Sequence, residues 1–466
     1  MKKIFVVIIA VCYSFLLVGQ TAEDALNLSL NDPMGSARFM GVSGAFGAVG
    51  GDFSALSTNP ASIALYKRSA VSLTPMVLSF NSSYADYNGS QSFFPKTRYT
   101  FTSFGMVFPI KGSQDWNMVQ LGFGYNRTMD FNRVRLVEGN SLGSSIGQYW
   151  ADIANSGVFT EEIDFAQDAN LILLRNGSYS SPSANMVQKY ISERKGGIDE
   201  MVFSLGGNWK DKLYVGATLG VPFLGYEEYS CYKEQDVNDE IGNFSYITYN
   251  DELKMGGVGV NLKLGLLYQP VNFFRFGAAF HTPTYYPLVR YSFTRQMTSE
   301  NVGDIIFNDY RFCLRTPMRL MVNTAFLINR RAFVSAEYEF ADYATSRLSP
   351  NSIRDAYSFS QENSEIRNIF NAVHIARIGA EVNLTQIFQL RAGYKLQTSP
   401  YEQSLQGACH SVSAGLGLRY KYFAMDLAYI YAVSSEDFWF YHPDYVNATY
   451  FKYISHRVAL SFEFKF

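Results

Sequence analysis

The last ten residues of the chain, Arg457–Phe466, read RVALSFEFKF and decide the fold. Large apolar side chains alternate here with small or polar ones, which is the period of two expected of a β-strand with one apolar face. The stretch ends on Phe466, which would leave an exposed hydrophobic edge in a soluble sandwich but suits a strand facing lipid. We therefore interpret it as the closing strand of a transmembrane β-barrel. The edge strand of a soluble all-β domain is the alternative.

The same alternation recurs from about Arg68 to the end of the chain. In residues 258–266, for example, Val and Leu alternate with Gly, Asn and Lys. Counting such segments predicts about fourteen strands, near residues 69–80, 97–109, 117–131, 199–209, 212–230, 244–268, 272–296, 309–328, 331–346, 373–384, 387–398, 409–421, 423–435 and 452–466. The connections alternate between short and long, as in outer-membrane barrels. The predicted fold is therefore all-β, a transmembrane antiparallel barrel over residues 67–466.

The composition agrees with a barrel. Aromatic residues make up 16% of the chain and there are 36 glycines, which is unusual in a soluble enzyme but expected where aromatic girdles flank closely packed strands. The formal net charge is -2 with no basic block, so no nucleic acid partner is indicated.

Residues 1–19 are predicted to be a secretory signal peptide. Two lysines precede an apolar run, Ile4–Val18, that is too short for a transmembrane helix. No other run of 18 apolar residues follows, so a mature chain that crosses a membrane does so as a barrel. We therefore expect the protein in the bacterial outer membrane.

The first mature segment, residues 20–66, does not alternate and is predicted to be a compact plug. Its glycines recur at every third residue: Gly41, Gly44, Gly47 and Gly50. Glycine lets backbones approach closely, and Asn59 before Pro60 indicates a turn. Both properties suit a segment packed inside a barrel.

Two connections are long enough to carry structure of their own. Residues 132–200 form the predicted large outer loop, with helical patterns at 145–154, 161–174 and 185–193. A second loop, residues 346–373, has one helical pattern at 361–370. Loops of this length are usually functional.

Residues 36–61 read SARFMGVSGAFGAVGGDFSALSTNPA, and here the chain resembles the FadL/TodX family of outer-membrane channels for hydrophobic compounds. Members of that family carry a Gly/Ala-rich N-terminal hatch, an Asp several residues on, and an Asn-Pro-Ala turn before the first strand. The matching positions are Gly41, Gly44, Ala45, Gly47, Ala48, Asp52, Asn59, Pro60 and Ala61. The rest of the chain matches only in architecture.

The resemblance implies that residues 20–66 form a hatch that blocks the lumen of a monomeric barrel lying among outer-membrane lipid. It also implies passive diffusion of hydrophobic small molecules such as long-chain fatty acids. In that family the ligand is thought to enter at the outer loops, reach an internal pocket and leave sideways through a gap in the wall. Lateral exit delivers an apolar ligand directly into lipid. No motif locates the gap or the pocket.

Arginines on the predicted lumen side are candidates for binding a ligand carboxylate through charge-assisted hydrogen bonds. They are Arg275, Arg319, Arg391 and Arg419, and the same reasoning applies to Arg377 and Lys395 on the predicted lumen side. The alternative, favoured for most of them because buried charges need partners, is pairing across the lumen with acidic residues. Those residues are Glu337, Glu339, Glu381 and Asp426.

No catalytic, metal or cofactor site is predicted. Residues 139–143 match the G-x-S-x-G nucleophile pattern but fall in a predicted outer loop, where a parallel sheet and a positioned histidine are missing. The five histidines form no i, i+4 pair. The acidic residues at 236–240 are interpreted as a solvated turn and not a calcium site. Three cysteines remain after export, Cys231, Cys313 and Cys409, and the sequence does not identify a disulfide among them.

Two other functional classes stay open at this stage. The first is a barrel of the same fold that binds a protein or assists secretion without transport, which a lumen packed shut around the hatch would favour. The second is an outer-membrane enzyme, which would need a serine and a histidine brought together at the rim.

Overall fold

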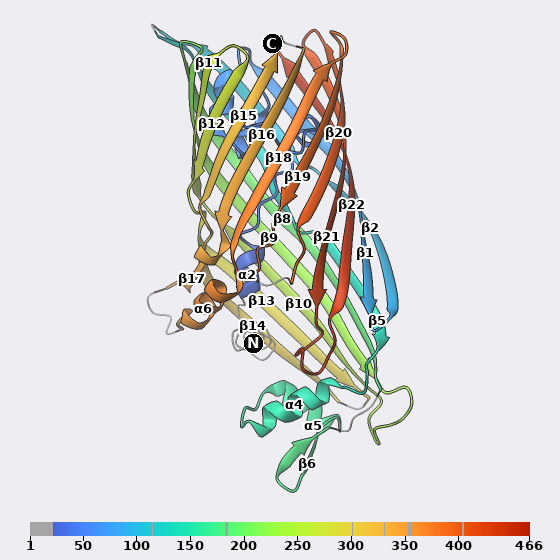
Figure 1. Cartoon of the computed structure of the whole chain (residues 1–466). Helices are drawn as coiled ribbons and strands as arrows, with labels where there is room; N and C mark the ends of the chain where they lie inside the picture. Colours follow the sequence, from blue (N-terminus) through green and yellow to red (C-terminus); the bar gives the residue numbers. More distant parts are fainter. Residues whose placement is uncertain are drawn as a thin grey trace.

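The computed structural model describes residues 22–113, 115–181, 185–300, 302–329, 331–352, 357–402 and 405–466. The predicted signal peptide, residues 1–19, lies outside the described residues. The described chain forms a closed antiparallel β-barrel of fourteen wall strands with the N-terminal segment inside it (Figure 1). The predicted fold class is confirmed.

Eight wall strands are continuous. They are β1 (Ala70–Tyr87), β8 (Val187–Trp209), β9 (Leu213–Gln235), β18 (Ala372–Asn383), β19 (Phe388–Gln397), β20 (Cys409–Tyr420), β21 (Phe423–Phe438) and β22 (Thr449–Lys465). Each of the other six is divided in two by a short break. The pairs are β2 (Ser90–Thr100) and β3 (Ser103–Lys111), β4 (Trp116–Asp130) and β5 (Arg133–Asn140), β10 (Tyr246–Val258) and β11 (Asn261–Val271), β12 (Phe274–His281) and β13 (Tyr285–Ser299), β14 (Gly303–Arg315) and β15 (Arg319–Ile328), and β16 (Ala332–Asp342) and β17 (Arg347–Pro350). The pairing of β22 with β1 closes the ring.

The two ends of the barrel differ. At one end, which we call the short-turn end, tight turns join the strands; Lys210 and Asp211 have φ angles of 52° and 54°, as a type I′ hairpin requires. The C-terminus lies at this end (Figure 1). The opposite end is the long-loop end. The prediction of a long connection after the first strand at that end is wrong. Strands β1 and β2 extend further than predicted and meet at Asn88 and Gly89. The expected long connection after the seventh strand is wrong for the same reason, because β13 and β14 are separated by only residues 300–302.

The outer face of the wall is an apolar belt. On β11, Leu262, Leu264 and Leu266 are 41%, 44% and 44% exposed, whereas Lys263 between them is 5% exposed and faces the lumen. Apolar-out, polar-in alternation is the pattern of a strand between lipid and a polar interior. Within the described residues, no helix is both long and apolar enough to span a membrane.

Most of the N-terminal segment lies in the short-turn half of the lumen, whereas its first helix lies nearer the long-loop end (Figure 1). It contains α2 (Ala22–Asn27), α3 (Ala37–Met40) and two 3-10 helices, η1 (Phe53–Ser57) and η2 (Pro60–Leu65). Side chains at the N-caps of the last three accept backbone N–H groups, namely Ser36 from Phe39, Asp52 from Ser54 and Asn59 from Ala61. The glycine-rich and Asn-Pro motifs therefore fold as a compact, turn-rich unit.

The large outer loop is shorter than the predicted 132–200, because β5 ends at Asn140 and β8 begins at Val187. It contains α4 (Ile146–Asn155), α5 (Glu161–Asp168) and the hairpin of β6 (Leu173–Arg175) and β7 (Ser178–Ser180). The helix predicted at 185–193 is wrong. Strand β8 covers most of it and is hydrogen-bonded to β5 on one side and β9 on the other, so tertiary pairing overrides the local pattern. In the second loop, η3 (Tyr343–Thr345) precedes β17, and α6 (Ser360–Ile369) forms where a helix was predicted.

Candidate functional site

The N-terminal segment contacts the wall most closely at glycines. A Cβ on Gly393 of β19 would lie 2.3 Å from the carbonyl carbon of Val42, and one on Gly216 of β9 would lie 2.4 Å from the carbonyl oxygen of Pro60. Gly41 and Gly415 face each other, with a Cβ on Gly415 only 3.3 Å from the Cα of Gly41. Glycines on both sides therefore allow backbone to pack against backbone.

Polar groups fasten the same segment to the wall. Gly47 N donates to Glu337 Oε2 at 3.1 Å, and Asn59 Nδ2 donates to Asn323 Oδ1 at 2.9 Å. Arg38 forms a bidentate pair with Glu381, with nitrogen to oxygen distances of 3.0 and 2.9 Å. The motif residues Gly47 and Asn59 thus contact the wall directly. Asp52 acts within the segment, where Ser36 Oγ donates to it at 2.6 Å.

The four candidate arginines are brought into this packed region. Arg319 pairs with Glu339 at 3.0 Å and Arg419 with Asp426 at 2.9 Å. Arg391 contacts both Glu381 at 2.6 Å and Asp426 at 2.7 Å.

Arg275 instead donates to Val49 O at 2.7 Å. A fifth arginine, Arg377, bridges Glu337 and Glu339 at 2.8 Å each. A role for any of the four candidates in ligand binding stays a prediction.

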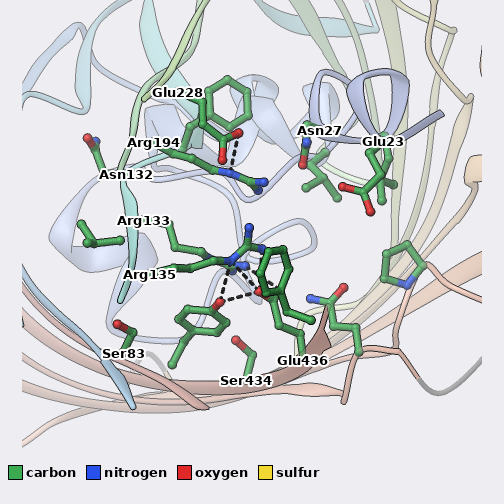
Figure 2. Close-up of a pocket in the computed structure, with 18 of the residues that line it drawn as sticks. Glu23, Asn27, Ser83, Asn132, Arg133, Arg135, Arg194, Glu228, Ser434 and Glu436 are labelled. Atoms are coloured by element: carbon green, nitrogen blue, oxygen red, sulfur yellow. Dashed lines mark hydrogen bonds and ion pairs between the residues drawn. The ribbon is translucent and has the colours of Figure 1, made fainter. Parts of the chain in front are cut away.

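A cavity of about 520 Å³ lies between α2 and the long-loop end, within the range of roughly 300–1,000 Å³ that is usual for small-molecule sites. Of the lumen-side cations predicted from the sequence, Lys395 lines it and the four candidate arginines do not. Part of its charged lining comes from β5, β8, β9 and β21, shown in Figure 2, and further charged residues come from α2, β2, β10, β13, β19 and β22. Its apolar lining includes Phe94, Met129, Phe131, Leu253, Phe293 and Phe438. The cavity is therefore amphipathic.

The charges in this cavity occur as pairs. Arg194 Nε contacts Glu228 Oε2 at 3.0 Å, and Arg135 contacts Glu436 Oε1 at 2.5 Å (Figure 2). Arg133 reaches the other oxygen of Glu436 at 3.3 Å. Sequence reasoning missed these residues because they lie where a long loop was expected, or beyond the apolar belt where alternation carries no signal.

Three acids of the N-terminal segment line the cavity, namely Glu23, Asp24 and Asp32. Glu23 on α2 accepts a hydrogen bond from Tyr401 Oη at 3.5 Å. Its side chain is exposed to the cavity, but the surrounding barrel shields it from bulk water. This desolvation raises the pKa of Glu23, although Arg194 and Arg135 oppose the shift.

Asp32 behaves in the opposite way. Burial alone would raise its pKa, but Lys395 at 2.6 Å and Arg457 at 3.6 Å hold the pKa below its ordinary value.

The wall beside the cavity is interrupted between β2 and β5. Each strand has a partner on its other side, β1 for β2 and β8 for β5. No backbone-to-backbone hydrogen bond joins the two across the described residues 90–100 and 133–140, although Glu138 N donates to Ser92 Oγ at 3.3 Å. Side chains bridge the interruption instead. Lys96 on β2 reaches Glu193 on β8 at 3.0 Å, and Arg98 contacts the same carboxylate. Lys96 also lines the cavity.

The remaining candidate groups are structural. Ser141 of the G-x-S-x-G match is 2% exposed and its hydroxyl accepts the Met186 N–H, which ties the start of the large loop to β8. Among the described residues no cluster of three metal-ligating side chains is present, and Cys231, Cys313 and Cys409 are free.

Comparison with known proteins identifies the fold. No protein-family model matches the chain, and no curated protein matches its sequence. Among solved structures, a FadL homologue from Pseudomonas aeruginosa is similar with a TM-score of 0.56 and 12% identity, covering 93% of this chain and 98% of its own. The toluene transporter TodX of Pseudomonas putida (TM-score 0.50, 14% identity, 89% and 94% covered) and the toluene transporter TbuX of Ralstonia pickettii (0.50, 14%, 95% and 100%) are also similar.

At this level of identity the likeness establishes a shared fold. The resemblance to the FadL/TodX family is thus confirmed at the level of the barrel. A closed barrel of this fold with an apolar belt is a protein of the bacterial outer membrane.

Proposed function

We propose that the protein is a channel through which hydrophobic small molecules such as long-chain fatty acids cross the outer membrane by passive diffusion. The observation that carries this proposal is the 520 Å³ cavity between α2 and the long-loop end. Its aromatic and aliphatic lining suits an acyl chain or a ring, and its paired arginines and glutamates suit a single polar head group. An amphiphile is therefore a better fit than a purely polar solute.

In this proposal the N-terminal segment is the hatch. It occupies the lumen between the cavity and the short-turn end, and its fastenings are individually breakable: Ser43 to Ser413 at 2.8 Å, Gly47 to Glu337, and Asp32 to Lys395. A ligand in the cavity would meet α2 (Ala22–Asn27) before the rest of the hatch, because α2 lines the cavity. Binding there would weaken the α2 contacts first.

The interruption between β2 and β5 is the proposed lateral exit. It adjoins the cavity through Phe94 and Lys96, and it is closed by side-chain contacts that cost less to break than a ladder of backbone hydrogen bonds. The outward residues of β2, Phe93 and Tyr99, are 51% and 64% exposed, so a ligand that leaves here meets an apolar surface.

A disulfide between hatch and wall tests this function. Ser43→Cys with Ser413→Cys places two thiols where hydroxyl oxygens lie 2.8 Å apart, close enough for a bond of about 2.05 Å after a small shift. The three native cysteines are first replaced by serine. Cells with the cysteine-free protein should take up labelled oleate or toluene faster than empty cells, the oxidised pair should lose this gain, and a reductant should restore it.

Ser43→Cys alone is the matched control and should behave as the cysteine-free protein. If that protein gives no gain for either probe, the channel proposal fails. If the oxidised and reduced pairs transport equally, the hatch does not gate.

One observation favours the alternative, a barrel that binds or secretes a protein without transport. The short-turn half of the lumen is closely packed, with backbone against backbone at Val42 and Gly393. The two outcomes are distinguishable, because a partner-binding barrel would show no uptake but would lose its partner when the helical loop around α4 and α5 is removed.

A further inference from the structure

A cluster of arginines stands on the outer surface at the long-loop end. It comprises Arg290 on β13, Arg311 and Arg315 on β14, and Arg347 on β17, which we call the arginine patch. In the strand register Arg290 lies directly opposite Arg311, and Arg315 directly opposite Arg347. The first three side chains are exposed and Arg347 is half-buried. Like charges placed directly opposite each other destabilise a pair of strands.

No member of the arginine patch forms an ion pair with any residue that the structure describes. Arg347 instead donates to the carbonyl oxygens of Ala344 and Ser346. Asp309 shares the outward face of β14 two residues from Arg311, but it forms no ion pair either. The contrast with the lumen is plain, because Arg319 and Arg391 there each have a carboxylate partner.

The electrostatic consequence is visible at Arg347. Burial and then the nearby charges of Arg367, on α6, and Arg315 lower its pKa. Asp342 opposes this shift without reversing it, so positive charge predominates around Arg347.

The position of the arginine patch relative to lipid is fixed by its neighbours. Arg315 lies opposite Tyr285, which is 46% exposed, and Met318 and Leu320, next along the same wall strand, are 45% and 43% exposed. On the adjoining strands an outward Tyr338 bonds to Nδ1 of His374 at 2.6 Å. Amphipathic aromatic side chains gather at the level of lipid head groups. The arginine patch thus begins where the apolar belt ends, on the side of β17 and α6 in Figure 1.

We infer that the arginine patch binds a membrane lipid whose head group carries phosphate. A guanidinium pairs with phosphate in a bidentate, charge-assisted geometry, and two such groups face each other in each pair. Arg311 and Arg315 are four residues apart, or about 13 Å along a strand. A glycolipid head group with two phosphates would engage one pair of arginines with each. Its acyl chains would lie on the belt at Tyr285 and Leu320.

The test compares two quadruple variants that remove the same charge. The first replaces Arg290, Arg311, Arg315 and Arg347 by Gln. The control replaces four exposed lysines of the short-turn end, Lys111, Lys210, Lys212 and Lys421, by Gln. Both are purified in detergent and checked for the heat-dependent gel shift of a folded barrel. Retention of lipid A, a bisphosphorylated glycolipid, is then measured by native mass spectrometry, with its dephosphorylated form and phosphatidylcholine as comparison lipids.

The expected result is that the native protein and the lysine variant retain lipid A, whereas the arginine variant retains it at least tenfold less. The comparison lipids should bind all three proteins weakly and equally. Equal retention by the two variants overturns the inference, because the binding would then follow net charge alone. Displacement of lipid A by millimolar inorganic phosphate would also overturn it, since the site would then recognise free phosphate and not a lipid.

Discussion

Replacing Gly393 by alanine should weaken the docking of the N-terminal segment while leaving every residue of that segment unchanged. The Cβ of an alanine there would lie 2.3 Å from Val42 C and 2.7 Å from both Val42 O and Ser43 N. Ordinary contact begins at 3.4 Å, so the segment must retreat by about 1 Å or the wall must deform. Gly393 does not have a positive φ, so its backbone accepts alanine. The penalty is therefore one of packing alone.

Overpacking of this kind costs about 1–3 kcal/mol. If the strain exists only while the segment is docked, the undocked population should rise by about 5- to 150-fold, because about 1.4 kcal/mol corresponds to a factor of ten. Undocking is reported by Ser62→Cys in a protein whose native cysteines are replaced. Ser62 is fully buried and its hydroxyl makes no hydrogen bond among the described residues, so this substitution removes no contact.

The assay is the rate at which a maleimide reagent modifies Cys at this position in the folded barrel. Gly225→Ala is the matched control: Gly225 also lies in a wall strand, yet a Cβ there meets no atom within 4 Å. Its labelling rate should equal that of the parent. Equal rates for Gly393→Ala and Gly225→Ala would refute the reasoning, because the contact would then impose no strain on docking.

Two further predictions concern the exit and the fastening of the segment. Glu193→Gln removes the charge that Lys96 and Arg98 share across the interrupted wall. Because partly exposed ion pairs contribute about 0.2–1 kcal/mol each, losing both should raise uptake of labelled oleate about 2- to 30-fold. Unchanged uptake would count against an exit at this position. Asp32 has a depressed pKa in the folded protein, so the stability that it contributes is present above its unfolded value of 3.8 and is lost as pH falls below it. The midpoint of thermal unfolding should therefore be lower for Asp32→Asn than for the native protein at pH 6, and the difference should shrink as the pH falls from 3.8 to about 2. A constant difference would mean that Lys395 is not the cause.

The barrel could be predicted from the sequence because the side-chain pattern of each wall strand reflects lipid on one face and the lumen on the other. Between lipid and lumen, side chains must alternate, and Leu262 and Lys263 show the rule in two adjacent residues. The N-terminal segment could be predicted for a different reason. Gly44 and Gly50 have φ angles of 81° and 65°, which favour glycine, and Asn59 caps η2, so these residues are informative without any tertiary contact.

The cavity could not be predicted because its residues come together only through pairing beyond the belt. There a strand has water or protein on both faces, and alternation disappears. Residues 187–193 show the consequence, since their local pattern favoured a helix while pairing with β5 and β9 makes them strand. Arg135 and Glu436 illustrate the same limit. They are 301 residues apart in sequence and meet only when β21 closes the barrel.

The distribution of charge inside the barrel separates two kinds of polar interior. Around the N-terminal segment, Arg377 and Arg391 are buried between carboxylates, and breaking such a pair leaves an uncompensated charge that costs several kcal/mol. In the cavity, Arg133 and Glu228 are paired and line the open space, so in the proposed channel an entering head group would exchange one partner for another. Such a ligand would compete more readily for the cavity charges than for those that hold the wall. For the proposed passive channel this difference matters, because the contacts of the cavity and α2 must open to a ligand while the barrel wall around them stays intact.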